Sequence, residues 1–132
     1  MFQHAALSLE DAKRVAAAAR AEAEKNGWAI VIAVVDDGGH LMYLERMDGT
    51  QKASNRIAEA KGRTAILFKR PTKAIEDNVK EGRTVMMVLP GAVPLEGGVP
   101  LMKDGQFVGG IGVPGVQSFQ DGVVARAGAA AL

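Results

Sequence analysis

Two histidines are the side chains in this sequence best suited to ligate a metal or move a proton. His40 directly follows the turn motif Asp37–Gly39, so one face of its ring should be open to an iron atom or to a substrate. An ordinary, partly exposed strand residue is the alternative interpretation. His4 lies close to the amino terminus and is a second possible haem-iron ligand, although a solvated tail explains it more simply.

A lysine on a helix face that is otherwise uncharged is a third candidate. That face repeats at helical spacing through Ile57, Lys61, Thr64 and Phe68. A lysine in such a stripe must extend its ammonium to solvent, form an ion pair or meet a ligand. Lys61 is therefore a candidate anion binder, and Glu96 or His40 is a candidate proton-transfer group.

The segment Gly110–Gly115 fits the pattern G-x-G-x-x-G, but its context rules out dinucleotide binding. The chain ends too soon after Gly115 to complete a βαβ unit or to supply the acidic residue that binds ribose. Two interpretations remain open. The glycines allow close packing or a bulge, or they let a ligand approach the backbone. The candidate ligand-binding residues are Gly38, Gly39, His40, Lys61, Gly97, Gly98, Gly110, Gly112, Pro114 and Gly115.

Composition restricts the class of protein. The 132 residues suit a single domain spanning 1–132, and 48% of them are hydrophobic. The formal net charge of +1 argues against a nucleic-acid partner, and the lack of cysteine excludes disulfides and thiolate metal sites. No apolar run is long enough to cross a membrane, and no secretory signal is visible, so a cytoplasmic protein is expected.

The pattern of hydrophobic and turn residues predicts an α+β domain. Asp37–Gly39 and Asp104–Gly105 predict two hairpins, and hence an antiparallel sheet. We expect Ser54 and Thr72 to cap helices. The predicted helices are Ser8–Asn26, Ser54–Phe68, Thr72–Gly82 and Gln117–Ala131, and the predicted strands are Ala29–Val35, His40–Arg46, Val85–Leu89, Val99–Lys103 and Gln106–Val113. Five strands with helices mainly on one face make a two-layer domain.

An ordered set of short motifs resembles the GlcG/HbpS-like family, which includes the C-terminal haem-binding domain of PduO-type corrinoid adenosyltransferases. The motifs are Val35–Leu41, Arg46–Gly49, Ser54, Ala60–Ala65, Arg70–Thr72, Gly97–Pro100 and Gly109–Val113. The resemblance implies a profilin/PAS-like fold with a five-stranded sheet and a homo-oligomer, a tetramer or an octamer. It also implies haem as the candidate cofactor and, for many members, a place in a small-molecule catabolic operon.

Two residues depart from the family pattern. Pro114 stands where the family usually has serine, and Gly62 stands where it usually has alanine. Proline removes an N–H and a hydroxyl at a turn that is expected to face ligand. Two functions remain: a binding module that holds haem or a related planar ligand in a glycine-lined cleft, and an enzyme or accessory subunit that acts on a small organic acid.

Overall fold

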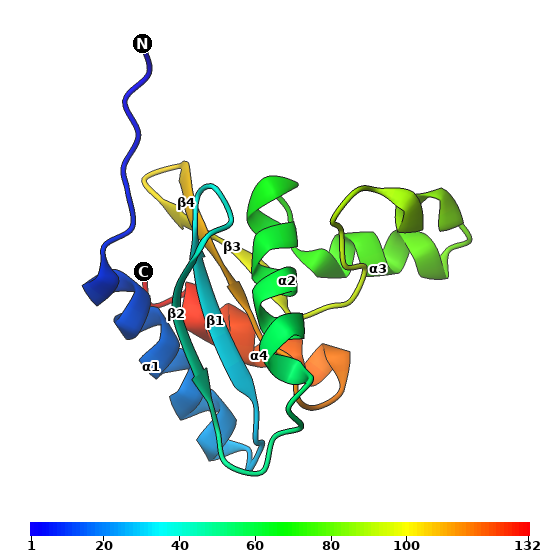
Figure 1. Cartoon of the computed structure of the whole chain (residues 1–132), viewed down its shortest axis with the longest axis horizontal. Coiled ribbons are helices and arrows are strands. Elements are labelled where there is room, and N and C mark those ends of the chain that lie inside the picture. Colours follow the sequence, from blue (N-terminus) through cyan, green and yellow to red (C-terminus); the bar gives the residue numbers. More distant parts are fainter.

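The computed structural model describes residues 1–132 and places four strands in one antiparallel sheet (Figure 1). The strands are β1 (Val31–Asp36), β2 (Leu41–Arg46), β3 (Gly98–Lys103) and β4 (Gln106–Gly112), in the order β2-β1-β4-β3. The prediction of a fifth strand at Val85–Leu89 is wrong. This segment is the 3-10 helix η1 (Thr84–Val88), which lies outside the sheet and leaves most of its apolar side chains exposed.

Helices cover both faces of the sheet, so the expected two layers with helices mainly on one face are also wrong. The helices α1 (Leu9–Lys25) and α4 (Ser118–Ala129) pack on one face, and α2 (Ser54–Leu67) packs on the other (Figure 1). The alternation of side chains in β1 explains this arrangement. Ile32 and Val34 join the larger core with α1 and α4, whereas Val31 and Ala33 pack with Ala58 of α2.

The helix α3 (Thr72–Lys80) and η1 form an excursion beside the sheet. The expected cap at Thr72 is wrong, because its hydroxyl accepts the backbone N–H of Gly98 at 2.8 Å and ties α3 to β3. The expected cap at Ser54 is wrong as well. Ala53 is the N-cap of α2, and the buried Ser54 hydroxyl has no hydrogen-bond partner. No helix is both long and apolar enough to cross a membrane.

Several local predictions are confirmed. Ser8 caps α1 in a capping box with Asp11, in which each side chain accepts the other residue's backbone N–H. Asp104 and Gly105, with φ of 50° and 77°, form the turn between β3 and β4. Positive φ at both central residues matches the twist of a two-residue hairpin.

Glycines, which have no side chain, allow α2 to lie very close to β4. A Cβ added to Gly112 would collide with the carbonyl oxygen of Ala58, and a Cβ on Gly110 would collide with that of Gly62. The glycine positions therefore set the distance between helix and sheet. This is the packing interpretation that the sequence left open for these glycines.

Candidate functional site

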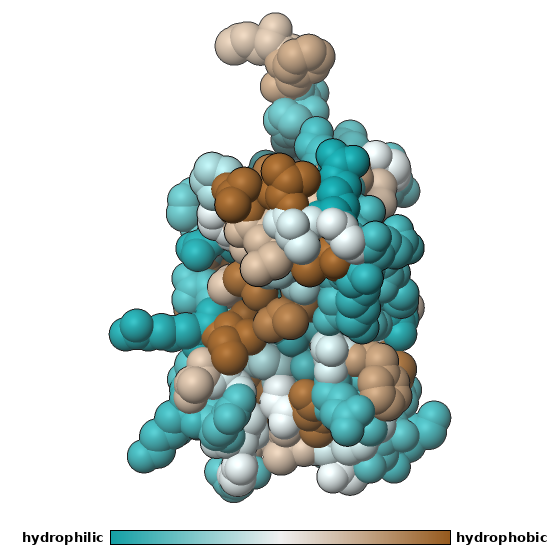
Figure 2. Space-filling model, turned by 90° about the vertical axis from the view of Figure 1, so that its right-hand side faces the viewer, coloured by the Kyte–Doolittle hydropathy of each residue, from teal (hydrophilic) through white to brown (hydrophobic).

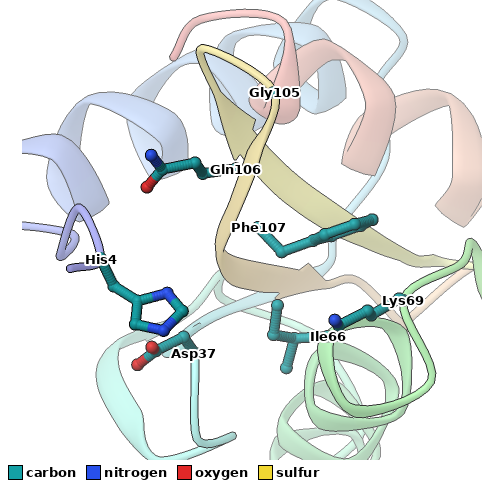
Figure 3. A pocket seen from close by; sticks show the side chains of 7 residues that line it. All are labelled: His4, Asp37, Ile66, Lys69, Gly105, Gln106 and Phe107. Carbon is teal, nitrogen blue, oxygen red and sulfur yellow. The ribbon is translucent and has the colours of Figure 1, made fainter. Parts of the chain in front are cut away.

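The first pocket lies at the end of the sheet where the two hairpin turns meet the amino-terminal segment. Figure 3 shows its side chains, which come from that segment, the two turns and the end of α2. Its volume is about 270 Å³. The lining residues are His4, Asp37, Ile66, Lys69, Gly105, Gln106 and Phe107.

This pocket combines an imidazole, an aromatic face and a cation. The ring of His4 lies beside the carboxylate of Asp37 (Figure 3). The Nζ of Lys69 lies 5.6 Å from the centroid of the Phe107 ring, within the range of a cation–π interaction. The side chain of Gln106 accepts the backbone N–H of Ala5 at 3.0 Å, which holds the segment carrying His4 against the sheet.

His40 lies on the same hairpin as Asp37 but points its free edge to solvent. Its Nδ1 is 3.1 Å from Oδ1 of Asp36, and its side chain is 81% exposed. Burial raises the pKa of the Asp36 carboxyl. The backbone N–H groups of His40 and Gly38 donate to it and, with the His40 ring, bring the net pKa below its usual value. The carboxylate thus orients a histidine whose Nε2 remains available.

Lys61 forms a buried ion pair rather than extending to solvent. Its Nζ donates to the carbonyl oxygen of Val113 and to Oδ2 of Asp121, each at 3.1 Å, and both charged side chains are 3% exposed. Burial raises the pKa of the Asp121 carboxyl, and the charge of Lys61 opposes this only in part. The pair lines a second pocket of about 230 Å³, together with Pro114 and Gly115.

Glu96 belongs to a network of charges that joins α3 to α4. Its carboxylate accepts from Arg126 at 3.1 Å, and its backbone N–H donates to Oε1 of Glu76 at 3.1 Å. Lys80 pairs with the other oxygen of Glu76 at 3.1 Å. The Glu96 carboxylate also lies directly against Gly122 of α4. These contacts already occupy the group that the sequence offered for proton transfer.

The structure does not bring His40 and Lys61 together. Asp36, the partner of His40, lies opposite Gly109 on β4. The carbonyl that binds Lys61 is at Val113, four residues further along the chain, or about 13 Å at the rise of an extended strand. The two candidates therefore serve different pockets.

Most of the predicted ligand-binding glycines are packed against protein. Gly97, Gly98, Gly110 and Gly112 are buried, and a Cβ on any of them would meet backbone. Gly39 lies against the side chain of Arg63. Within the predicted set, Lys61, Pro114 and Gly115 line one pocket together, and these residues remain the candidates for contact with a ligand.

Sequence reasoning missed three residues that contribute to the pockets. Lys69 and Phe107 lie far apart in the sequence, one just after α2 and the other on β4, and no motif links them. Asp121 is 60 residues from Lys61, and its place in the first turn of α4 could be explained by the helix dipole alone. No three or more histidine or acidic side chains cluster closely enough to hold a metal ion.

Glu76 provides a pH test of the charge network. Burial raises its pKa, but the backbone N–H of Glu96 and the charge of Lys80 bring the net pKa below the usual value. Such a group stabilises the fold above its unfolded pKa of about 4.3, and this stability is lost as the pH falls through the lower folded value. We expect Glu76→Gln to cost about 1 to 2 kcal/mol at pH 7 and to flatten the pH dependence below pH 4.3.

Urea unfolding at pH 7 and at pH 3 measures both effects. The control is Glu81→Gln, which removes an exposed carboxylate at the C-cap of the same helix. Equal acid sensitivity of Glu76→Gln and the wild type would contradict the role assigned to this carboxylate.

Comparison with known proteins agrees with this architecture. Residues 7–130 match the family described as haem degrading protein HbpS-like. Protein GlcG of Escherichia coli K12 is 47% identical over 107 residues, which cover 81% of this chain and 80% of GlcG. The chain belongs to the HbpS-like family.

Solved structures share the fold over nearly the full chain. A double mutant of Streptomyces reticuli HbpS superposes with a TM-score of 0.89 at 37% identity, covering 100% of this chain and 90% of that one. A PduOC–haem complex superposes with a TM-score of 0.85 at 28% identity, covering 97% of this chain and 96% of that one. The resemblance seen in the sequence is confirmed.

Proposed function

We propose that this protein binds haem, or a related planar cofactor, at the pocket that contains His4. The observation that supports this most strongly is the PduOC–haem complex, a relative with the same fold in which haem is bound. In this chain, His4 brings a ring nitrogen to a pocket that also holds an aromatic face and a cation. A haem site needs an axial ligand, an apolar contact surface and a partner for the propionate groups.

The residues present fit these needs. His4 would ligate the iron, Phe107 would contact the macrocycle, and Lys69 would pair with a propionate. Bound haem would supply an iron centre for ligand binding or one-electron chemistry. A volume of about 270 Å³ is slightly below the usual range of about 300–1,000 Å³ for small-molecule sites, so part of the macrocycle would extend beyond the pocket.

His40 is the alternative iron ligand. Metal-binding histidines usually donate their second ring N–H to a carboxylate or a carbonyl, and the Asp36 contact at Nδ1 provides such a partner. Its exposure means that haem bound there would need further contacts from another molecule or another chain.

We propose in addition that the protein is a homo-oligomer, a tetramer or an octamer. Figure 2 shows apolar side chains gathered on the face beside α3 and η1. Val85, Met87 and Val88 of η1 are 60%, 58% and 75% exposed. Contiguous exposed apolar residues of this kind are typical of protein–protein contact surfaces.

Titration with haemin tests the proposed function. We expect saturable binding with an intense Soret band, and we expect His4→Ala to shift the band and weaken the affinity at least 10-fold, because the axial bond is lost. Gln3→Ala, a change at the neighbouring exposed position, is the matched control. Light scattering of the same samples gives the number of chains.

The results separate the possible outcomes clearly. A shifted band in His40→Ala alone assigns the axial bond to His40. An unchanged band and affinity in both histidine variants exclude histidine ligation, and no saturable haemin binding by the wild type excludes the function.

A further inference from the structure

The pocket beside the Lys61–Asp121 pair lies away from the haem candidate site. It is bounded by α2, by the loop before β3 and by the connection between β4 and α4. Ile57, Leu95, Pro114 and Val116 make its apolar walls. The polar lining comes from Gln51, Lys61, Ser118 and Asp121, and the volume is about 230 Å³.

The hydrogen bonds of the ion pair show which group remains available to a ligand. A lysine ammonium has three hydrogens to donate, and Lys61 uses two of them, one to Val113 and one to Asp121. Each oxygen of Asp121 already accepts one hydrogen bond, Oδ1 from the backbone N–H of Val116 and Oδ2 from Lys61, both at 3.1 Å. The donor left over at this pair is the third hydrogen of Lys61, and a ligand that meets it must bring an acceptor.

The nearby charges do not repel such a ligand strongly. Asp121 is balanced by Lys61, the Glu96 carboxylate by Arg126, and the Glu76 carboxylate, which contacts Ser118, by Lys80, each pair at 3.1 Å. The hydroxyl of Ser118, which also lines the pocket, already donates to the Glu76 carboxylate. The ammonium of Lys61 is therefore the donor at this pocket, and a hydrogen bond between ions is about twice as strong as a neutral one.

We propose that this pocket binds a small carboxylate with a short aliphatic chain, held by the third hydrogen of Lys61. The volume is below the usual range of about 300–1,000 Å³ for small-molecule sites, so the ligand has only a few heavy atoms. The walls of isoleucine, leucine, proline and valine select an aliphatic chain over a polar one. The site is independent of the proposed haem site and of His4.

Calorimetric titration with butyrate tests this proposal, with butyramide as the neutral isostere and sodium chloride as the ionic control. We expect saturable butyrate binding in the millimolar range and at least 10-fold weaker binding of butyramide. Leu95→Trp should fill the pocket and lower the affinity for butyrate at least 10-fold. Leu67→Trp is the matched control, because this leucine is also exposed but does not line the pocket.

The double variant Lys61→Met/Asp121→Leu removes both charges together, so that no buried charge is left alone. We expect it to fold and to lose the preference for butyrate over butyramide. The proposal is overturned if the wild type does not bind butyrate saturably, if butyrate and butyramide bind equally, or if Leu95→Trp binds like the wild type. Haemin titration of the same variants gives a separate readout, which this proposal expects to be unchanged.

Discussion

Replacing Lys61 by methionine is expected to lower the free energy of unfolding by about 3 to 5 kcal/mol, because it leaves the buried Asp121 carboxylate without its partner. Urea unfolding at pH 7 measures this loss. The loss should shrink in acid, since burial already raises the pKa of Asp121. A folded pKa above the unfolded value means that the native state gains stability as the pH falls and the carboxyl takes up a proton.

Two further variants make this expectation specific. Lys61→Met/Asp121→Leu should recover most of the lost stability, because an apolar pair can replace a buried ion pair at little cost. Lys13→Met, on an exposed position of α1, should stay within about 0.5 kcal/mol of the wild type. A single Lys61→Met variant as stable as the wild type at pH 7 would show that Asp121 finds another partner or reaches water.

Gly112→Ala is expected to lower the stability of the fold more than any other glycine-to-alanine substitution in the sheet. The new Cβ would collide with the carbonyl oxygen of Ala58 and crowd the backbone nitrogen of Gly62. Both obstacles are main chain, so they cannot rotate away, and α2 would have to move off the sheet. We expect a loss of about 3 kcal/mol or more, at the upper end for overpacking, measured as the shift in the urea midpoint.

Gly62→Ala is the matched control from the other side of the same contact. Its Cβ would lie 3.2 Å from the backbone nitrogen of Gly112, which is tight but requires only a small shift. Alanine also favours the helix over glycine by about 1 kcal/mol. We expect a net change of less than about 1 kcal/mol. Equal effects of the two substitutions would contradict the proposed importance of the close backbone contact.

The elements that were predicted correctly depend on residues close together in the sequence. Ser8 and Asp11 cap one helix within a single turn, and Asp104–Gly105 determines a hairpin through its own backbone angles. The strand predicted at Val85–Leu89 failed because apolar and β-branched residues favour a strand only where the segment packs on a sheet. Here the segment lies in the excursion beside the sheet, closes on itself as η1 and buries only Met86.

The layers and the pockets could not be derived in the same way, because they depend on contacts between distant residues. The position of α2 follows from the close approach of Gly62 to Gly112. The sequence around these two glycines does not indicate that they contact each other. Lys61 was correctly interpreted as a lysine in need of a partner, but Asp121 is 60 residues away. His40 and His4 were named as alternatives, and the structure places His4 and the turn before His40 at one end of the sheet.

The excursion between α2 and β3 has a consequence for how this fold can be altered. It is fastened by hydrogen bonds from Thr72 to Gly98 and from Glu76 to Glu96, and by Thr64 of α2, which bonds the backbone of Gly91 and Val93. The exposed turn at Gly82 lies outside these attachments and has nothing packed against the glycine Cβ position. Extra residues inserted there would leave the pairing of all four strands in place. This turn is thus the natural position for length variation and for grafting a foreign peptide onto this scaffold.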